Sequence, residues 1–173
     1  GDLGALGATL ARAEGDIAAV VLEVIQGEGG IRVAPDGYLR AVRACCDRHD
    51  VMLVIDEVQT GLGRTGSLFA CEQEGVVPDV LTLAKALGGG LVPIGAVLSN
   101  ARCFSEEFAL RHSSTFAGNA LAALVGLRSL HLLTRDDRAL VRHVASCGDE
   151  LAAGLAGLRA RFPALVKDVR GRG

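Results

Sequence analysis

The sequence lacks the segments that would assign it to a membrane, to secretion or to nucleic acid. Its longest apolar runs, such as Val51–Ile55 and Ala120–Leu127, are far shorter than the roughly 20 residues that a bilayer-spanning helix needs. Its start lacks a basic segment followed by an apolar one, so no signal peptide is visible. The net charge is -2 and the basic residues are scattered, which argues against a surface for polyanions. We therefore expect a cytoplasmic protein that binds neither membranes nor nucleic acid.

The cysteines also lack a pattern that would indicate a metal site or a disulfide framework. There are five of them, an odd number, and no pair has C-x-x-C spacing. Cys45 and Cys46 fall within a helical pattern, where they would act as small apolar filling residues. We expect no metal ion and no disulfide.

The remaining composition is that of a globular protein, with 50% apolar and 22% charged residues in 173. Both ends are unusual. The chain opens without a methionine, and it closes on Val169–Gly173, a pattern that leads into a strand with no strand after it. We interpret the sequence as a piece of a longer protein.

Apolar runs and helical patterns alternate along the chain. Strands are predicted over residues 18–25, 51–55, 80–84 and 94–98, and helices over 37–49, 68–74, 120–133 and 138–161. This alternation predicts an α/β fold with a mostly parallel sheet and flanking helices. We assign residues 1–125 to a large domain, and residues 126–173 to a connecting helix and the start of a smaller domain.

Two polar residues follow the two central strands. Asp56 comes directly after the run Val51–Ile55, and Lys85 ends the run that begins at Val80. Continuous apolar runs are typical of parallel strands buried on both faces, whose carboxyl ends carry functional sites. Lys85 also precedes Gly88–Gly90, which would let a ligand approach the backbone. We expect Asp56 and Lys85 to face one crevice, with Lys85 as a desolvated amine.

Two other motifs are weaker. The segment Gly61–Gly66 fits G-x-G-x-x-G, but it does not directly follow its strand, and acidic Asp56 and Glu57 would repel a pyrophosphate. The strand followed by this acidic pair also looks like the magnesium-holding segment of P-loop NTPases, yet the sequence lacks the partner motif G-x-x-x-x-G-K-[ST].

Chemistry based on pyridoxal 5'-phosphate (PLP) uses these features together. This cofactor needs a lysine for its aldehyde and a carboxylate for its pyridinium nitrogen, and Lys85 and Asp56 supply one of each. Taken alone, Asp56 would more commonly cap a turn and Lys85 would more commonly be a surface lysine. The pair, with the glycines beside it, favours a PLP site.

Four segments in the same order resemble the class III aminotransferases, which include ornithine, acetylornithine, putrescine and other ω-amine transaminases. They are Glu23–Gly30, Asp56–Gly66, Pro78–Gly90 and Ser114–Asn119. The resemblance implies the central part of the aspartate-aminotransferase-like fold, known as PLP fold type I, truncated at both ends. It also implies a PLP-dependent enzyme.

The resemblance implies a role for each matching residue of the cofactor site. Lys85 matches the lysine that holds PLP as a Schiff base and later moves a proton between substrate and cofactor. Asp56 matches the partner of the pyridinium nitrogen. Val58 matches the aliphatic residue packed on one face of the ring, and Gln59 matches the residue near the ring hydroxyl.

Three further residues match positions outside that group. Ser114 and Thr115 match the hydroxyl region that reaches the cofactor phosphate of a neighbouring subunit, which implies a homodimer with shared active sites. Glu28 matches a glutamate that, in several members, pairs with an arginine and swings away when a 2-oxo acid binds. Because Glu28 lies in a predicted loop, it could equally be a solvated surface acid.

The implied reaction is ping-pong transfer of an amino group from an amine donor to a 2-oxo acid, with 2-oxoglutarate as the expected acceptor. The spacing of Gly88–Gly95 is closer to ornithine and putrescine enzymes than to acetylornithine enzymes, which favours an ω-amino acid or a diamine as the donor. A decarboxylase, racemase or aminomutase on the same fold remains an alternative. So does an inactive fragment that serves as a structural or interaction module.

Overall fold

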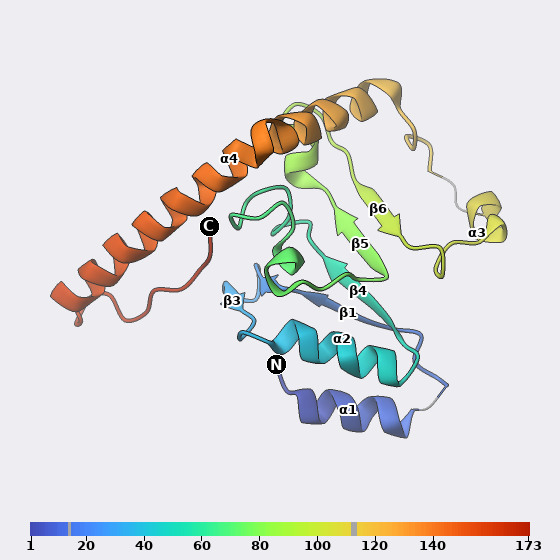
Figure 1. Ribbon diagram of the computed structural model, residues 1–173, viewed down its shortest axis with the longest axis horizontal. Coiled ribbons are helices and arrows are strands. Elements are labelled where there is room, and N and C mark those ends of the chain that lie inside the picture. The colour runs from blue at the N-terminus through green and yellow to red at the C-terminus, as the bar shows by residue number, and fades with distance from the viewer. Residues whose placement is uncertain (14, 112–113) are drawn as a thin grey trace.

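The computed structural model describes residues 1–13, 15–111 and 114–173, and it contains a four-stranded sheet with helices around it (Figure 1). The strands are β1 Ala19–Glu23, β2 Ile25–Gln26, β3 Arg32–Val33, β4 Met52–Asp56, β5 Val80–Leu83 and β6 Ala96–Ser99. The α-helices are α1 Leu3–Arg12, α2 Tyr38–Arg48, α3 Glu106–Arg111 and α4 Ala120–Arg161. Two 3₁₀-helices, η1 Ala70–Glu74 and η2 Lys85–Gly88, flank β5 in the sequence.

The main sheet has the strand order β1-β4-β5-β6. β1 pairs with β4 and β4 with β5 in parallel, whereas β6 runs antiparallel to β5. This confirms the predicted mostly parallel sheet with flanking helices. The fourth strand begins at Ala96, two residues later than predicted, and it reverses direction because η2 and a glycine turn replace the crossover helix that a parallel strand would need. β2 and β3 form a separate antiparallel pair.

The core lies between the sheet and α2. Leu53 and Ile55 of β4 are fully buried, and Leu39, Val42 and Cys46 of α2 pack with them in one cluster. Cys46 therefore fills apolar space, as the helical pattern predicts. The edge strand β1 differs from the prediction, because Val21 is 67% exposed, so β1 is not buried on both faces in this chain.

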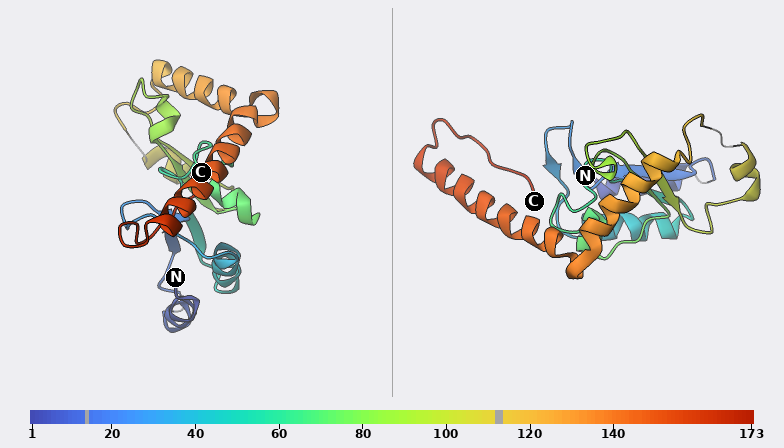
Figure 2. Two further views of the ribbon diagram at one scale, coloured as in Figure 1. Left: turned by 90° about the vertical axis from the view of Figure 1, so that its left-hand side faces the viewer. Right: turned by 90° about the horizontal axis from the view of Figure 1, so that it is seen from above.

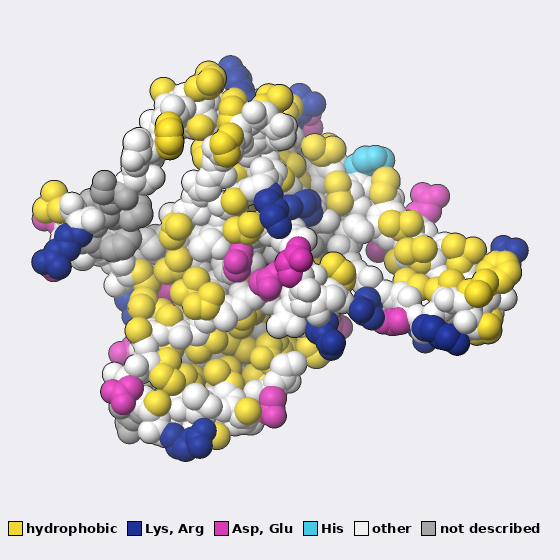
Figure 3. Space-filling view, turned by 180° about the vertical axis from the view of Figure 1, so that it is seen from behind, with side chains coloured by type: hydrophobic (Ala, Val, Ile, Leu, Met, Phe, Trp, Pro, Cys, Tyr) yellow, Lys and Arg dark blue, Asp and Glu magenta, His cyan; other side chains and the backbone are white. Residues whose placement is uncertain are grey.

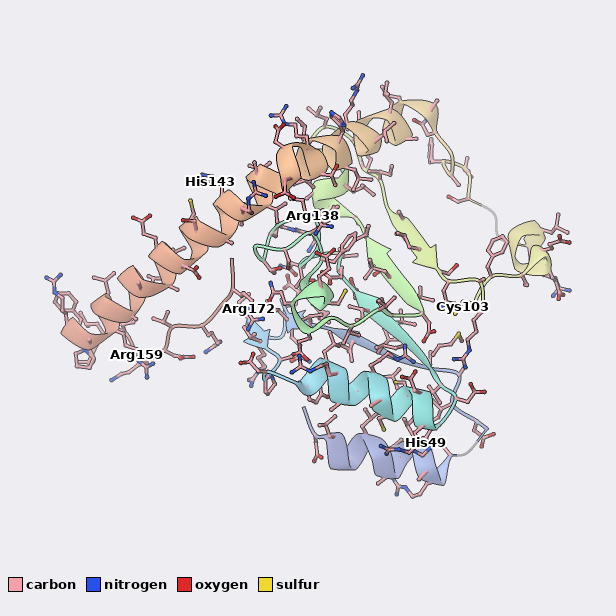
Figure 4. The ribbon with its side chains drawn as sticks, viewed as in Figure 1. His49, Cys103, Arg138, His143, Arg159 and Arg172 are labelled. Atoms are coloured by element: carbon pink, nitrogen blue, oxygen red, sulfur yellow. The ribbon has the colours of Figure 1, made fainter. Side chains whose placement is uncertain are left out.

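The helical predictions differ from the structure in two places. The stretch 68–74 forms only the short 3₁₀-helix η1. The two long predicted helices, 120–133 and 138–161, form one element, α4, with a break at Arg135–Arg138 where the backbone leaves helical geometry. Arg138 at this break forms a 3.0 Å ion pair with Glu72 of η1, and Figure 4 shows its place at the start of the second half of α4.

The second half of α4 extends away from the sheet (Figure 2). Apolar side chains on this half are exposed, as the view from behind illustrates (Figure 3). Its exposed leucines include Leu140, Leu151, Leu155 and Leu158. None of the described helices is long and apolar enough to cross a membrane. The division of the chain at residue 125 lies within α4 and stays a prediction.

Candidate cofactor site

The carboxyl ends of β4 and β5 bring the two main predicted residues to one edge of the sheet. Glu23, Asp56 and Thr82 form one row across β1, β4 and β5. Lys85 follows β5 directly after Ala84, at the start of η2. The apolar runs fold this way because β4 and β5 are parallel neighbours, so both chains leave the sheet at the same edge.

The carboxylate of Asp56 is half-buried, and one of its oxygens is engaged by the protein. Oδ1 accepts a 2.8 Å hydrogen bond from the backbone N–H of Val58 and a 3.1 Å bond from the hydroxyl of Thr82. No hydrogen bond from the described residues reaches Oδ2. Asp56 therefore caps the turn with one oxygen and offers the other to a ligand.

Lys85 does not meet the expectation of a desolvated amine in this chain, because its side chain is exposed. Within the described residues its amine takes part in no hydrogen bond or ion pair. The backbone of Lys85 has φ +49°, a left-handed conformation that costs a non-glycine residue about 1 kcal/mol and is common at functional sites.

Val58 and Gln59 form the turn after β4, and both are half-buried. Gln59 lies against the loop that follows β2, since a Cβ on Gly27 would stand 2.0 Å from the Gln59 amide oxygen. That loop is held by Glu23, whose carboxylate accepts a 3.1 Å hydrogen bond from the Gly27 N–H. The ends of β1 and β4 thus pack together beside Asp56.

Glu57 occupies a place that the sequence interpretation did not give it. The sequence suggests that Glu57, like Asp56, would repel a bound pyrophosphate. Its side chain is instead fully buried and points into the core. Its carboxylate accepts hydrogen bonds from the Thr60 hydroxyl at 2.6 Å and the Cys71 N–H at 2.8 Å. The alternation along β4, with Leu53 and Ile55 also buried, is the signal that predicts this orientation.

Arg64 is a second residue that the sequence interpretation missed. Its guanidinium donates to the backbone oxygen of Val58 and, at 3.1 Å, to that of Gly61. Burial lowers the pKa of Arg64, and the nearby charge of Glu57 opposes this shift. Arg64 therefore closes the glycine loop onto the turn that carries Val58 and Gln59.

Three further predicted residues lie in exposed loops. Glu28 is exposed in the loop after β2, and Ser114 and Thr115 are exposed in the segment before α4. None of their side chains forms a hydrogen bond with the described residues. Lys85, Asp56, Val58 and Gln59 thus follow two neighbouring strands at one edge of the sheet, and the roles of all seven residues stay predictions.

A groove lies elsewhere on the described surface, between the second half of α4 and the C-terminal tail. It encloses about 630 Å³ and is lined by residues such as Leu155, Arg159 and Val169. No residue of the predicted cofactor group lines it. In the described ranges there is also no cluster of three His, Cys, Asp or Glu side chains suited to a metal ion.

Comparison with known families gives the deciding observation. The profile described as aminotransferase class-III matches residues 3–173. The chain belongs to the class III aminotransferase family. The family resemblance predicted from four sequence segments is thereby confirmed.

Solved structures of class III aminotransferases superpose closely on the chain. Acetylornithine aminotransferase from Elizabethkingia anophelis is 38% identical, with a TM-score of 0.90, and the match covers 99% of this chain and 42% of that one. N-acetylornithine aminotransferase from Stenotrophomonas maltophilia is 44% identical, with a TM-score of 0.81, over 99% and 43%. Ornithine aminotransferase from Toxoplasma gondii, described with partial occupancy of PLP at its active site, is 39% identical, with a TM-score of 0.84, over 99% and 39%. The chain thus spans about two-fifths of the length of these relatives.

Proposed function

We propose that the full-length protein is a PLP-dependent transaminase, with this chain supplying the core of its cofactor site. The observation that carries the proposal is that Asp56 and Lys85 lie at the same edge of the sheet, after two parallel neighbouring strands, in a class III family member. These two residues fit the cofactor. Asp56 Oδ2 accepts no hydrogen bond from the described residues, and Lys85 is exposed, so both groups are accessible to a ligand. Bound PLP would supply an aldehyde for amines and a ring that withdraws electrons from the substrate carbon.

Each residue of this group would have a role once PLP is bound. Asp56 Oδ2 would accept a hydrogen bond from the protonated ring nitrogen, and the Lys85 amine would hold the cofactor at its aldehyde. Lys85 Nζ would also be the group that takes up and returns a proton at the substrate carbon. Val58 would contact the ring, and Gln59 would hold its hydroxyl. The left-handed backbone of Lys85 sets the direction from which the amine approaches.

The proposed substrates are an ω-amino acid or a diamine as donor and 2-oxoglutarate as acceptor, used in ping-pong order. Support comes from the relatives named for ornithine and acetylornithine, and from the Gly88–Gly95 spacing. Glu28 contacts the substrate side of the site in this proposal, and its exposed loop position leaves it accessible.

The proposal includes a cytoplasmic homodimer. Ser114 and Thr115 lie outside the Asp56 group and are exposed, as hydroxyls that serve a neighbouring subunit's phosphate would be. The five cysteines are all free thiols, in keeping with a reducing compartment.

The test uses the full-length protein loaded with PLP and reduced with borohydride. We expect peptide mass spectrometry to find the cofactor fixed on Lys85, and Lys85→Ala to abolish this product. Lys167→Ala is the matched control, because Lys167 is the other lysine of this chain and its amine donates a hydrogen bond to the backbone oxygen of Pro163 in the C-terminal tail. Fixation on another lysine, or none, would overturn the assignment.

The reaction type is tested separately. We expect glutamate to form when the enzyme is given ornithine or putrescine together with 2-oxoglutarate. Release of carbon dioxide or racemisation of the donor, without glutamate, would instead identify one of the other reactions known for this fold.

A further inference from the structure

Thr82 is a polar residue in the middle of the apolar strand β5, and it stands beside Asp56 in the sheet. The two residues are register partners of the parallel β4–β5 pair. Thr82 is half-buried, and its neighbours Leu81 and Leu83 point into the core. Its side chain is therefore on the same face of the sheet as the carboxylate of Asp56.

The Thr82 hydroxyl donates its hydrogen bond to Asp56 Oδ1 at 3.1 Å. The other donor to that oxygen is the backbone N–H of Val58 at 2.8 Å. Because both bonds end on Oδ1, they fix the rotation of the carboxylate and leave Oδ2 as its outward acceptor. Thr82 is the one side chain among the described residues that holds the carboxylate in this rotation.

We infer that Thr82 is a positioning residue of the transaminase, acting through its hydroxyl to aim Asp56 Oδ2 at the cofactor nitrogen. The inference rests on the proposed function, since it concerns the same site. Without the hydroxyl, the Asp56 carboxylate can turn about the single Val58 bond. The acceptor then spends less time in the direction that the ring nitrogen requires.

Two substitutions of Thr82 separate a positioning role from a purely structural one. Valine has nearly the same shape as threonine and a high strand propensity, but it has no hydroxyl. Serine keeps the hydroxyl but is a poorer strand residue. If Thr82 serves the strand, Thr82→Ser is the more damaging change, whereas a positioning role makes Thr82→Val the more damaging one.

The experiment measures PLP binding to the apo form of the full-length protein for the wild type, Thr82→Val and Thr82→Ser. We expect Thr82→Val to raise the dissociation constant of PLP by roughly 10-fold or more, as for loss of a hydrogen bond to a charged group. Its kcat should fall more than its KM changes, and the pH dependence of the bound-cofactor absorbance should shift. Thr82→Ser should stay within about 3-fold of the wild type, because it keeps the same donor.

Asn100→Ala is the matched control. Asn100 donates a 2.9 Å hydrogen bond to the carboxylate of Asp79 at the opposite edge of the sheet, so its loss should lower thermal stability without changing PLP affinity. If Thr82→Val binds PLP like the wild type, or Thr82→Ser is impaired as much as Thr82→Val, the positioning role is wrong. If the wild type itself binds no PLP, the proposed function is wrong and the inference falls with it.

Discussion

The buried carboxylate of Glu57 accepts a 2.8 Å hydrogen bond from the backbone N–H of Cys71. Its other oxygen accepts from the hydroxyl of Thr60. One side chain thus ties the end of β4 to the glycine loop and to η1. Asp56, the preceding residue in the chain, points to the opposite face, so Glu57 supports the turn without belonging to the proposed cofactor group.

Replacing Glu57 should therefore affect folding before it affects chemistry. Glu57→Ala leaves the Cys71 N–H and the Thr60 hydroxyl without a partner in the core, which should cost about 2–4 kcal/mol of unfolding free energy. Glu57→Gln keeps one acceptor and the shape, so it should cost clearly less. Urea unfolding of the full-length variants provides the measurement. Equal losses for the two variants would contradict this account.

The thiol of Cys71 should be inert in the native protein. Burial and the neighbouring Glu57 raise the pKa of Cys71 to about 12. Cys147, by contrast, is exposed on α4. Labelling of the native protein with iodoacetamide at pH 8, read by mass spectrometry, should modify Cys147 first and Cys71 only on unfolding. Early modification of Cys71 would show that η1 opens readily.

The raised pKa of Cys71 should also make the folded protein less stable at alkaline pH. The unfolded chain ionises its thiol above about pH 9, whereas folded Cys71 keeps its proton up to about pH 12. The folded state therefore binds more protons between these values, and stability should fall by up to roughly 1.4 kcal/mol per pH unit there. Cys71→Ala should flatten this part of the stability profile, even though it loses some packing.

Asp79 gives the corresponding acid limit. Burial alone would raise its pKa, but hydrogen bonds from Leu53 N, Arg43 and Asn100 outweigh burial and lower the pKa to about 2. Because the folded pKa lies below the ordinary value of 3.8, this stabilisation is complete above about pH 4 and is lost as the pH falls towards about 2. Unfolding midpoints between pH 6 and pH 2 should show the decline in the wild type and a smaller one in Asp79→Asn.

Gly27 is required for space beside Gln59. A methyl group there would meet the Gln59 amide at 2.0 Å, and this flexible side chain would turn away with little change to the fold. We expect Gly27→Ala to leave the thermal midpoint nearly unchanged and to lower kcat/KM by about 10- to 100-fold, the usual range for a misplaced contact group.

Gly154→Ala is the control for that glycine substitution. Gly154 lies in α4 with nothing within 4 Å of an added methyl group, so alanine should stabilise the helix by roughly 0.5–1 kcal/mol. Activity should stay at the wild-type level. A loss of activity as large as that of Gly27→Ala would show that the effect does not arise from contact with Gln59.

Local sequence patterns predicted many of the helices and strands of this fold. The apolar runs that became β4 and β5 and the helical spacing of α2 predicted these elements to within a residue or two, because burial and hydrogen bonding act on neighbours in sequence. The geometry of η1 could not be predicted from the local sequence. Its short apolar pattern fits a helix, but its geometry depends on Glu57, which is distant in sequence and binds the Cys71 N–H.

The sequence by itself determined the family and the α/β order of the elements, and it indicated the lysine and the carboxylate of the proposed cofactor site, since these depend on residue type and spacing. The tertiary structure alone decided which way each side chain turned. Glu57 is buried in the core, Asp56 Oδ1 accepts hydrogen bonds from Thr82 and Val58, and Lys85 is exposed. These outcomes depend on strand register and on how segments distant in the sequence pack together. Register is a long-range property, and a one-residue shift would have exchanged the faces of Asp56 and Glu57.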